Sequence, residues 1–100
     1  MVKSQLTSKK IIGEIKNKKN NLKELGVKKI GLFGSFAKGK QHKKSDIDIL
    51  VSFKNINLDN YENLLYLLEK VFKRKIDLII EKDLHPAFSY VKKEAKYVKL

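Results

Sequence analysis

Three short apolar runs, separated by longer segments with a different repeat, restrict the fold of this chain more than any other feature. The runs lie between glycine, polar or charged residues, and they cover residues 28–33, 45–53 and 75–80. Apolar runs of this length are typical of strands buried in a sheet. The link between the second and third runs is long enough for a parallel crossover, whereas the shorter link between the first two leaves their relative direction open.

In the longer segments, apolar residues recur every three or four positions, which is the spacing of an amphipathic helix. The pattern predicts helices over residues 8–25 and 58–72. Residues 34–45 hold two glycines and four lysines, and they are predicted to form a turn, including a single helical turn, and a loop. A last helix is predicted to begin near Pro86, because proline is tolerated in a first helical turn, and to run through Val98.

This order of elements predicts an α/β (α+β) fold, in which helices pack on a small mixed sheet of about three strands. A chain of 100 residues buries enough surface for one core and not for two, so residues 1–100 are expected to form a single domain. The absence of cysteine excludes disulfides, thiolate metal sites and cysteine nucleophiles. No apolar run approaches the roughly 20 residues of a membrane span. We therefore expect no membrane association and a cytoplasmic location.

The chain is strongly basic, because 23 lysine and arginine residues oppose 11 acidic ones and give a formal charge of +12. Nearly all of the surplus is lysine, and Arg74 is the only arginine. A lysine-rich surface attracts polyanions but lacks the planar fork with which arginine binds phosphates and bases through paired hydrogen bonds. The charge therefore permits polyphosphate, nucleic acid or an acidic partner as ligands.

Two aspartates lie two residues apart on a predicted strand, so Asp46 and Asp48 project from the same face, within about 7 Å of one another. Their mutual repulsion is on the order of 3 kcal/mol at about 5 Å and an effective dielectric near 20. A third acid, Asp77, interrupts another apolar strand, where an unpaired charge is costly. Magnesium prefers hard oxygen ligands and is often held by carboxylates together with substrate phosphates. Three converging aspartates would thus form a cage for two cations.

Two of the three acids, Asp46 and Asp77, also have a structural explanation that needs no metal. Asp46 follows Ser45 at the start of a strand, where either residue often accepts a local hydrogen bond in a turn. Asp77 fits an acid on the edge strand of a sheet. Asp-x-Asp alone therefore leaves both interpretations open.

A second candidate site follows the first predicted strand directly. Gly34 allows the backbone to approach a phosphate, and the hydroxyl of Ser35 can donate a hydrogen bond or cap the turn. Backbone amides at the start of a helical turn bind phosphate. Lys38 and further lysines of the loop would balance a triphosphate, although the same residues also fit a capped helix start and a solvated loop.

The combination of these features is more specific than its parts. Gly34-Ser35, then ten residues, then Asp46-Ile47-Asp48, then Asp77 in the next strand, resembles the signature of the nucleotidyltransferases of the DNA polymerase beta type. The run GLFGSFAKGKQHKKSDIDILVSF is similar to minimal nucleotidyltransferase (MNT) domains, and above all to MntA-type antitoxins, which are encoded beside toxins of the HEPN ribonuclease class. The resemblance extends from the first helix to the C-terminus. One departure is Lys38, where the family commonly has arginine.

This resemblance implies a polymerase-beta-like nucleotidyltransferase fold and the antitoxin of a type VII-like toxin–antitoxin pair. The implied activity is Mg²⁺-dependent protein adenylylation, in which AMP passes from ATP to a tyrosine hydroxyl of the cognate HEPN toxin. Asp46 and Asp48 would hold two Mg²⁺ ions, and Asp77 would complete one metal site and help to deprotonate the hydroxyl. The β and γ phosphates of ATP would be held by Gly34, Ser35 and Lys38.

Two other functions remain open on the sequence. A non-catalytic antitoxin would neutralise the toxin by covering its surface, and the three acids would then have no role in transfer. A small basic RNA-binding protein would use its lysines and would bind RNA with a steep dependence on salt. Direct binding of nucleic acid is not expected under the nucleotidyltransferase interpretation, but the charge does not exclude it.

Overall fold

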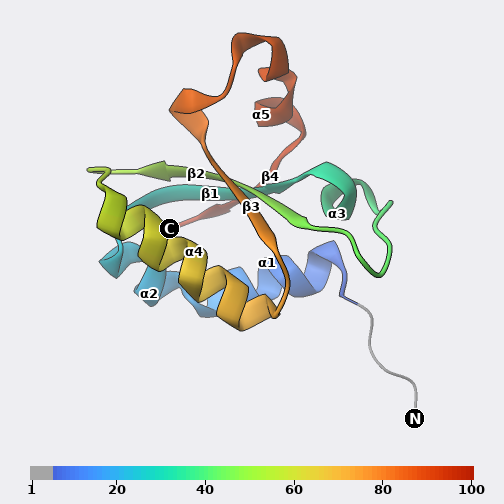
Figure 1. The fold of residues 1–100 in the computed structure, drawn as a ribbon, viewed down its shortest axis with the longest axis horizontal. Coiled ribbons are helices and arrows are strands. Elements are labelled where there is room, and N and C mark those ends of the chain that lie inside the picture. The colour runs from blue at the N-terminus through green and yellow to red at the C-terminus, as the bar shows by residue number, and fades with distance from the viewer. Residues whose placement is uncertain (1–5) are drawn as a thin grey trace.

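A mixed four-stranded sheet in the order β3-β2-β1-β4 organises the chain (Figure 1). The computed structural model describes residues 6–100, and the strands are β1 Val27–Phe33, β2 Ile47–Phe53, β3 Ile76–Ile80 and β4 Lys96–Lys99. β1 runs antiparallel to both β2 and β4, while β2 and β3 are parallel. The predicted α+β class, mixed sheet and parallel crossover are confirmed, and the direction between the first two strands is antiparallel.

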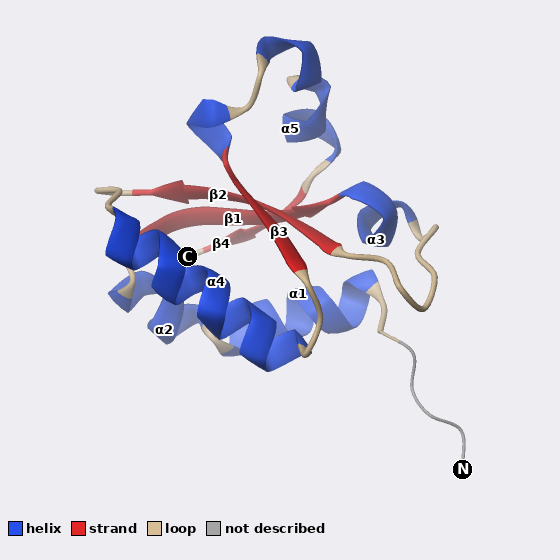
Figure 2. Ribbon diagram, in the orientation of Figure 1, coloured by secondary structure: helices blue, strands red, loops and turns tan. Residues whose placement is uncertain are grey.

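Three helices cover one face of the sheet (Figure 2). They are α1 Ser8–Asn17, α2 Lys19–Glu24 and α4 Leu58–Phe72. Asn57 caps α4, since its side-chain oxygen accepts a hydrogen bond from the amide of Asn60 at 2.8 Å. Within residues 6–100, no helix is both long enough and apolar enough to cross a bilayer.

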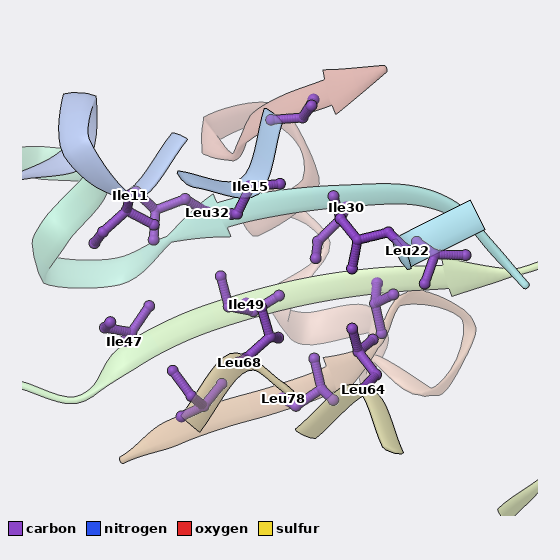
Figure 3. Packing of buried hydrophobic residues seen from close by; sticks show 14 of the residues in the cluster. Ile11, Ile15, Leu22, Ile30, Leu32, Ile47, Ile49, Leu64, Leu68 and Leu78 are labelled. Atoms are coloured by element: carbon purple, nitrogen blue, oxygen red, sulfur yellow. The ribbon is translucent and has the colours of Figure 1, made fainter. Parts of the chain in front are cut away.

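The main core lies between these helices and the sheet (Figure 3). Alternate residues of the strands point toward the helices, where they meet the apolar stripes of α1, α2 and α4. The fully buried members include Ile11, Ile15, Leu22, Ile30, Leu32, Ile47, Ile49, Val51 and Leu64. Because the alternation continues along β2, the side chains between these buried positions point to the opposite face.

The opposite face is partly covered by the segment between β3 and β4, which rises above the sheet in orange and red in Figure 1. It comprises the 3₁₀ turns η1 Glu81–Asp83 and η2 Pro86–Phe88 and the short helix α5 Tyr90–Glu94. Leu50 is fully buried on this face, opposite the main core. The remaining helix, α3 Gly34–Lys38, follows β1 directly and ends at Gly39.

The predicted first helix over residues 8–25 is in fact two helices, α1 and α2, which are separated at Lys18. Residues 16–21 contain no apolar side chain and three asparagines, so no side chain in this stretch is anchored in the core. Asparagine also competes for backbone hydrogen bonds and favours turns. Ile15 and Leu22 both stay buried although the helix breaks between them.

The prediction of a long helix from Pro86 to Val98 is wrong. Its proline begins a 3₁₀ turn, its middle forms α5, and its end is β4, so the sheet has four strands rather than about three. Val91, Ala95 and Val98 have helical spacing, but β4 pairs with the free edge of β1 from Lys29 to Leu32. Backbone hydrogen bonds to a distant strand outweigh a weak local periodicity.

Two glycines provide a matched test of the packing of β4 on β1. A Cβ at Gly31 would lie 2.7 Å from a ring carbon of Tyr97, whereas a Cβ at Gly13 of α1 meets nothing within 4 Å. We expect Gly31→Ala to lower the free energy of unfolding by about 1–3 kcal/mol through overpacking. Gly13→Ala should raise it by up to about 1 kcal/mol, because alanine favours a helix. Urea unfolding of both variants measures this, and equal effects would contradict the proposed packing.

Candidate active site

The parallel pairing of β2 with β3 places two of the predicted acids side by side. Asp48 is the register partner of Asp77, so both side chains lie on the same face of the sheet, opposite the main core. Asp48 is half-buried and Asp77, on the edge strand, is exposed. The sequence predicted that these two acids converge, and the register brings them together.

The environment of Asp48 disfavours its charge. Burial contributes most, the negative charges of Asp77 and Asp46 add to it, and a hydrogen bond with the carboxyl group of Asp77 contributes last. Together these effects raise the pKa of Asp48 from 3.8 to about 6. Two carboxylates that share a site cannot both ionise easily, so one of them holds its proton to a higher pH.

Asp46 lies just outside the strand, because β2 begins at Ile47 rather than at Ser45 as predicted. The preceding turn is closed by Ser45, whose hydroxyl accepts a hydrogen bond from the amide of His42 at 2.9 Å. A carboxylate oxygen of Asp46 lies 3.9 Å from the ammonium of Lys75, and both side chains are largely exposed. Such an exposed pair contributes little to stability. Asp46 is thus close enough to act on Asp48 through its charge but stands at the margin of the site.

The donor chemistry of this site fits a divalent cation. Carboxylate oxygens are the ligands that Mg²⁺ prefers, and no lysine or arginine within residues 6–100 forms an ion pair with Asp48 or Asp77. The raised pKa of Asp48 reflects its burial first and then the negative charges of Asp77 and Asp46. In the described part of the chain, no three acidic, histidine or cysteine side chains form a compact group of metal ligands. The cage of three acids for two ions therefore stays a prediction, with Asp48 and Asp77 as its closest pair.

Gly34 lies directly against the Asp48 carboxylate. It begins α3 with a φ of +74°, and a Cβ at this position would overlap the carboxylate oxygen of Asp48. Only glycine satisfies both the backbone conformation and the close approach. Ser35 follows in the first turn of α3 and is half-buried. The predicted phosphate-binding turn thus adjoins the acid pair.

Lys38 points toward a different partner from the one expected. It lies in the last turn of α3, and its ammonium is 3.6 Å from a carboxylate oxygen of Glu94 in α5. Both side chains are about half exposed, so the pair is weak and exchangeable with solvent or an anion. The predicted role of Lys38 in phosphate binding stays a prediction.

Arg74 has a structural role that the sequence analysis missed. Its guanidinium donates hydrogen bonds to the carbonyl oxygens of Lys43 and Ser45, at 3.0 and 2.9 Å, and lies 5.3 Å from the centre of the Phe36 ring. Arginine can bind two carbonyls and an aromatic face at once. It therefore ties the lysine-rich loop, which ends next to Asp46, to the residues that precede β3 and Asp77. A single arginine among so many lysines was the only available signal.

Tyr61 of α4 supports the edge strand that carries Asp77. Its hydroxyl donates a hydrogen bond to the carbonyl oxygen of Leu78 at 2.6 Å. Burial, followed by the negative charge of Asp77, raises the pKa of Tyr61. The hydroxyl thus stays protonated and holds β3 next to the position where Asp77 projects. Nothing in the sequence distinguished this tyrosine from an ordinary core residue.

Comparison with known proteins places the whole arrangement in a family. Residues 9–99 match the nucleotidyltransferase domain. MntA, a protein adenylyltransferase of Thermococcus cleftensis, is 34% identical over 98 residues, which cover 95% of this chain and 99% of MntA. MJ1379 of Methanocaldococcus jannaschii, a candidate protein adenylyltransferase, is 44% identical over 81 residues, which cover 78% of this chain and 79% of that protein.

Solved structures agree with these sequence matches. The structure of a candidate minimal nucleotidyltransferase superposes with a TM-score of 0.80 at 25% identity and covers 94% of this chain and 98% of that one. The crystal structure of a toxin–antitoxin with AMP-PNP superposes with a TM-score of 0.65 at 27% identity, covering 81% of this chain and 69% of that one. The chain therefore belongs to the nucleotidyltransferase domain family and is a homologue of the MntA protein adenylyltransferases.

Proposed function

We propose that this nucleotidyltransferase is the antitoxin of a type VII-like toxin–antitoxin pair and transfers AMP from ATP to a tyrosine hydroxyl of a HEPN-type ribonuclease toxin. The observation that carries the proposal is the register pairing of Asp48 with Asp77 beside Gly34. The 34% identity to MntA, a protein adenylyltransferase, supports protein as the acceptor. The likeness to a toxin–antitoxin structure with AMP-PNP supports a toxin partner and an adenine nucleotide.

The chemistry follows from what these residues can hold. The tyrosine oxygen bonds to the α-phosphorus of ATP, the bond from that phosphorus to the bridging oxygen breaks, and pyrophosphate leaves with the electron pair. Asp77, on the exposed edge strand, accepts the proton of the hydroxyl. Asp46 and Asp48 would supply carboxylate oxygens to two divalent cations, and Asp77 would complete the ligand set of one of them. When bound, Mg²⁺ stabilises the charge on the attacking and leaving oxygens.

In this proposal the phosphates of ATP bind at the first turn of α3, beside Asp48. Gly34 begins the helical turn whose backbone amides face a phosphate oxygen, and the hydroxyl of Ser35 donates a hydrogen bond to that oxygen. Lys38 exchanges Glu94 for the triphosphate, which is a modest change because their ion pair is largely solvated. Lysine provides charge without the planar fork of arginine, so its contact is less directional.

The first prediction concerns transfer itself. Asp48→Asn and Asp77→Asn should each lower the rate of AMP transfer by more than about 100-fold, because substitutions in the shell outside metal ligands already cost 10–100-fold. The substrate is the all-helical protein with an Arg-x4-6-His motif that we expect to be encoded beside this chain. Intact-mass analysis of that protein after incubation with ATP and Mg²⁺ detects each added AMP.

Asp59→Asn is the matched control, since it makes the same chemical change at an exposed position of α4. It should leave transfer within about twofold of the native rate, since surface substitutions away from such a site have small effects. If the native chain inhibits the toxin without any gain in the toxin's mass, and both site variants inhibit equally well, the protein neutralises by binding and the transfer proposal fails.

The second prediction separates loss of chemistry from loss of fold. Without metal, Asp48→Asn should be more stable than the native protein at pH 7.5, because it removes a repelled and half-buried charge. We expect a gain of about 1 kcal/mol in the free energy of unfolding, well below the full value of the pKa shift, because water screens the exposed part of the side chain.

The pH dependence gives the sign of this effect. The pKa of Asp48 is higher in the folded than in the unfolded protein, so the folded state binds more protons between about pH 4 and about pH 6. The native protein should therefore lose stability as the pH rises through this window, and Asp48→Asn should lose less. Urea unfolding at pH 4 and pH 7.5, in EDTA, tests this. A variant less stable than the native protein at pH 7.5 would show that the acids do not repel one another.

The third prediction uses two glycines that share a backbone conformation. Gly34 and Gly39 have φ angles of +74° and +70°, but only Gly34 lies against Asp48, and a Cβ at Gly39 meets nothing within 4 Å. Both alanine variants carry similar backbone strain, about 1 kcal/mol. Gly34→Ala should in addition displace the Asp48 carboxylate and reduce AMP transfer at least tenfold. Gly39→Ala should keep transfer within about twofold, and equal activities would contradict the role of Gly34.

A further inference from the structure

A cavity lies at the end of the sheet remote from the acids. Its volume is about 410 Å³, it is open to solvent, and it is lined by the start of β1, the end of β2 and the end of β3. The residues that matter here are Lys28, Ser52, Phe53, Ile80, Lys54 and Lys82. Ser52 is four residues beyond Asp48 on the same strand, which corresponds to about 13 Å. The cavity is thus separate from the candidate active site.

Three segments each bring one lysine to this cavity. Lys28 lies where the pairing of β1 with β2 shifts register, between Val27 and Lys29, and such a bulge redirects a side chain. Lys54 follows β2, and its amide donates a hydrogen bond to the carbonyl of Gly26 at 2.8 Å. This hydrogen bond holds the residue after β2 against the residue before β1. The third, Lys82, lies in η1 after β3. Their convergence is therefore a product of the fold and not of a run of lysines in the sequence.

The three ammonium groups are unpaired. Within residues 6–100, Lys28, Lys54 and Lys82 form no ion pair or side-chain hydrogen bond, and no acidic residue lines the cavity. Two acids flank Lys82 in the chain: Glu81 is already bound to Lys29 at 3.4 Å and accepts a hydrogen bond from Tyr97 at 3.2 Å, and Asp83 does not line the cavity. A concave site lined by one sign of charge concentrates counter-ions. An anion with several negative charges would neutralise the three ammonium groups.

The other residues that line the cavity limit the chemical class of ligand that it can bind. Phe53 and Ile80 provide apolar surface, and the hydroxyl of Ser52 can donate a hydrogen bond. A cavity of this volume is within the usual range for small molecules. We propose that it binds a nucleoside polyphosphate, with the phosphates against the three lysines and the base against Phe53 and Ile80. This second nucleotide site goes beyond the proposed transfer reaction and does not depend on it.

The test is an NMR titration of the ¹⁵N-labelled full chain with ATP in buffer that contains EDTA, so that no cation assists binding at the acids. We expect saturable shifts of the amides of Ser52, Asn55 and Lys82, with little change at Asp48 and Gly34. Inorganic tripolyphosphate should cause the same pattern with weaker affinity. Equal affinity for the two anions would overturn the assignment to a nucleoside, and shifts centred on Gly34 would overturn the second site.

Two triple variants that lose the same charge show whether ATP binds to the cavity lysines or to the basic surface in general. Replacing Lys28, Lys54 and Lys82 by glutamine should weaken ATP binding at least tenfold at about 0.1 M salt. The matched control replaces Lys9, Lys19 and Lys70, which are exposed and lie outside the cavity, and it should change affinity less than twofold. If both triple variants lose affinity equally, the lysines act as a diffuse field and the proposal is wrong. This result is independent of whether AMP transfer is observed.

Discussion

The parallel pairing of β2 with β3 is the constraint on which the candidate site depends. Parallel strands place register partners on the same face, so Asp48 and Asp77 meet without any loop to position them. The hydrogen bonds of the sheet fix their separation more firmly than a surface loop would. The fold accepts a repelled pair of carboxylates, since burial and like charge raise the pKa of Asp48 to about 6. A divalent cation bound between the two carboxylates would remove their repulsion, so the unfavourable charge pair would then favour binding.

Since β3 is an edge strand, it needs support from outside the sheet. Helix α4 forms the crossover from β2 to β3, and its Tyr61 hydroxyl binds the carbonyl of Leu78. Arg74 ties the segment before β3 to the loop before β2 through the carbonyls of Lys43 and Ser45. These two contacts lie on either side of Asp77 in the chain. The edge position leaves the side chain of Asp77 exposed, while the two contacts hold its backbone.

The candidate site residues could be predicted from the sequence, but one of the four strands of the sheet could not. Alternation along β2 placed Asp46 and Asp48 on one face, because period-two alternation is a local property, whereas the convergence of Asp77 with them was predicted from the combined motif and its family resemblance. The strand β4 was missed, because its four residues pair with β1, more than 60 positions earlier, and their spacing also fits a helix. The same reason applies to Arg74, whose partners lie 29 and 31 residues away. Neither β4 nor the role of Arg74 could be predicted from the local sequence pattern, because both depend on residues far away in the chain.

The distribution of charge matters more here than its sum. The Asp48–Asp77 pair and the three cavity lysines lie toward opposite ends of β2, about 13 Å apart along the strand, which exceeds the Debye length of about 8 Å at physiological ionic strength. Neither group therefore neutralises the other in spite of the net charge of +12. A lysine in contact with Asp48 or Asp77 would neutralise part of the pair's charge and would weaken the cation binding that we propose there. The Asp48–Asp77 pair and the three cavity lysines can thus both stay without a counter-charge on one small sheet, because the length of β2 separates them.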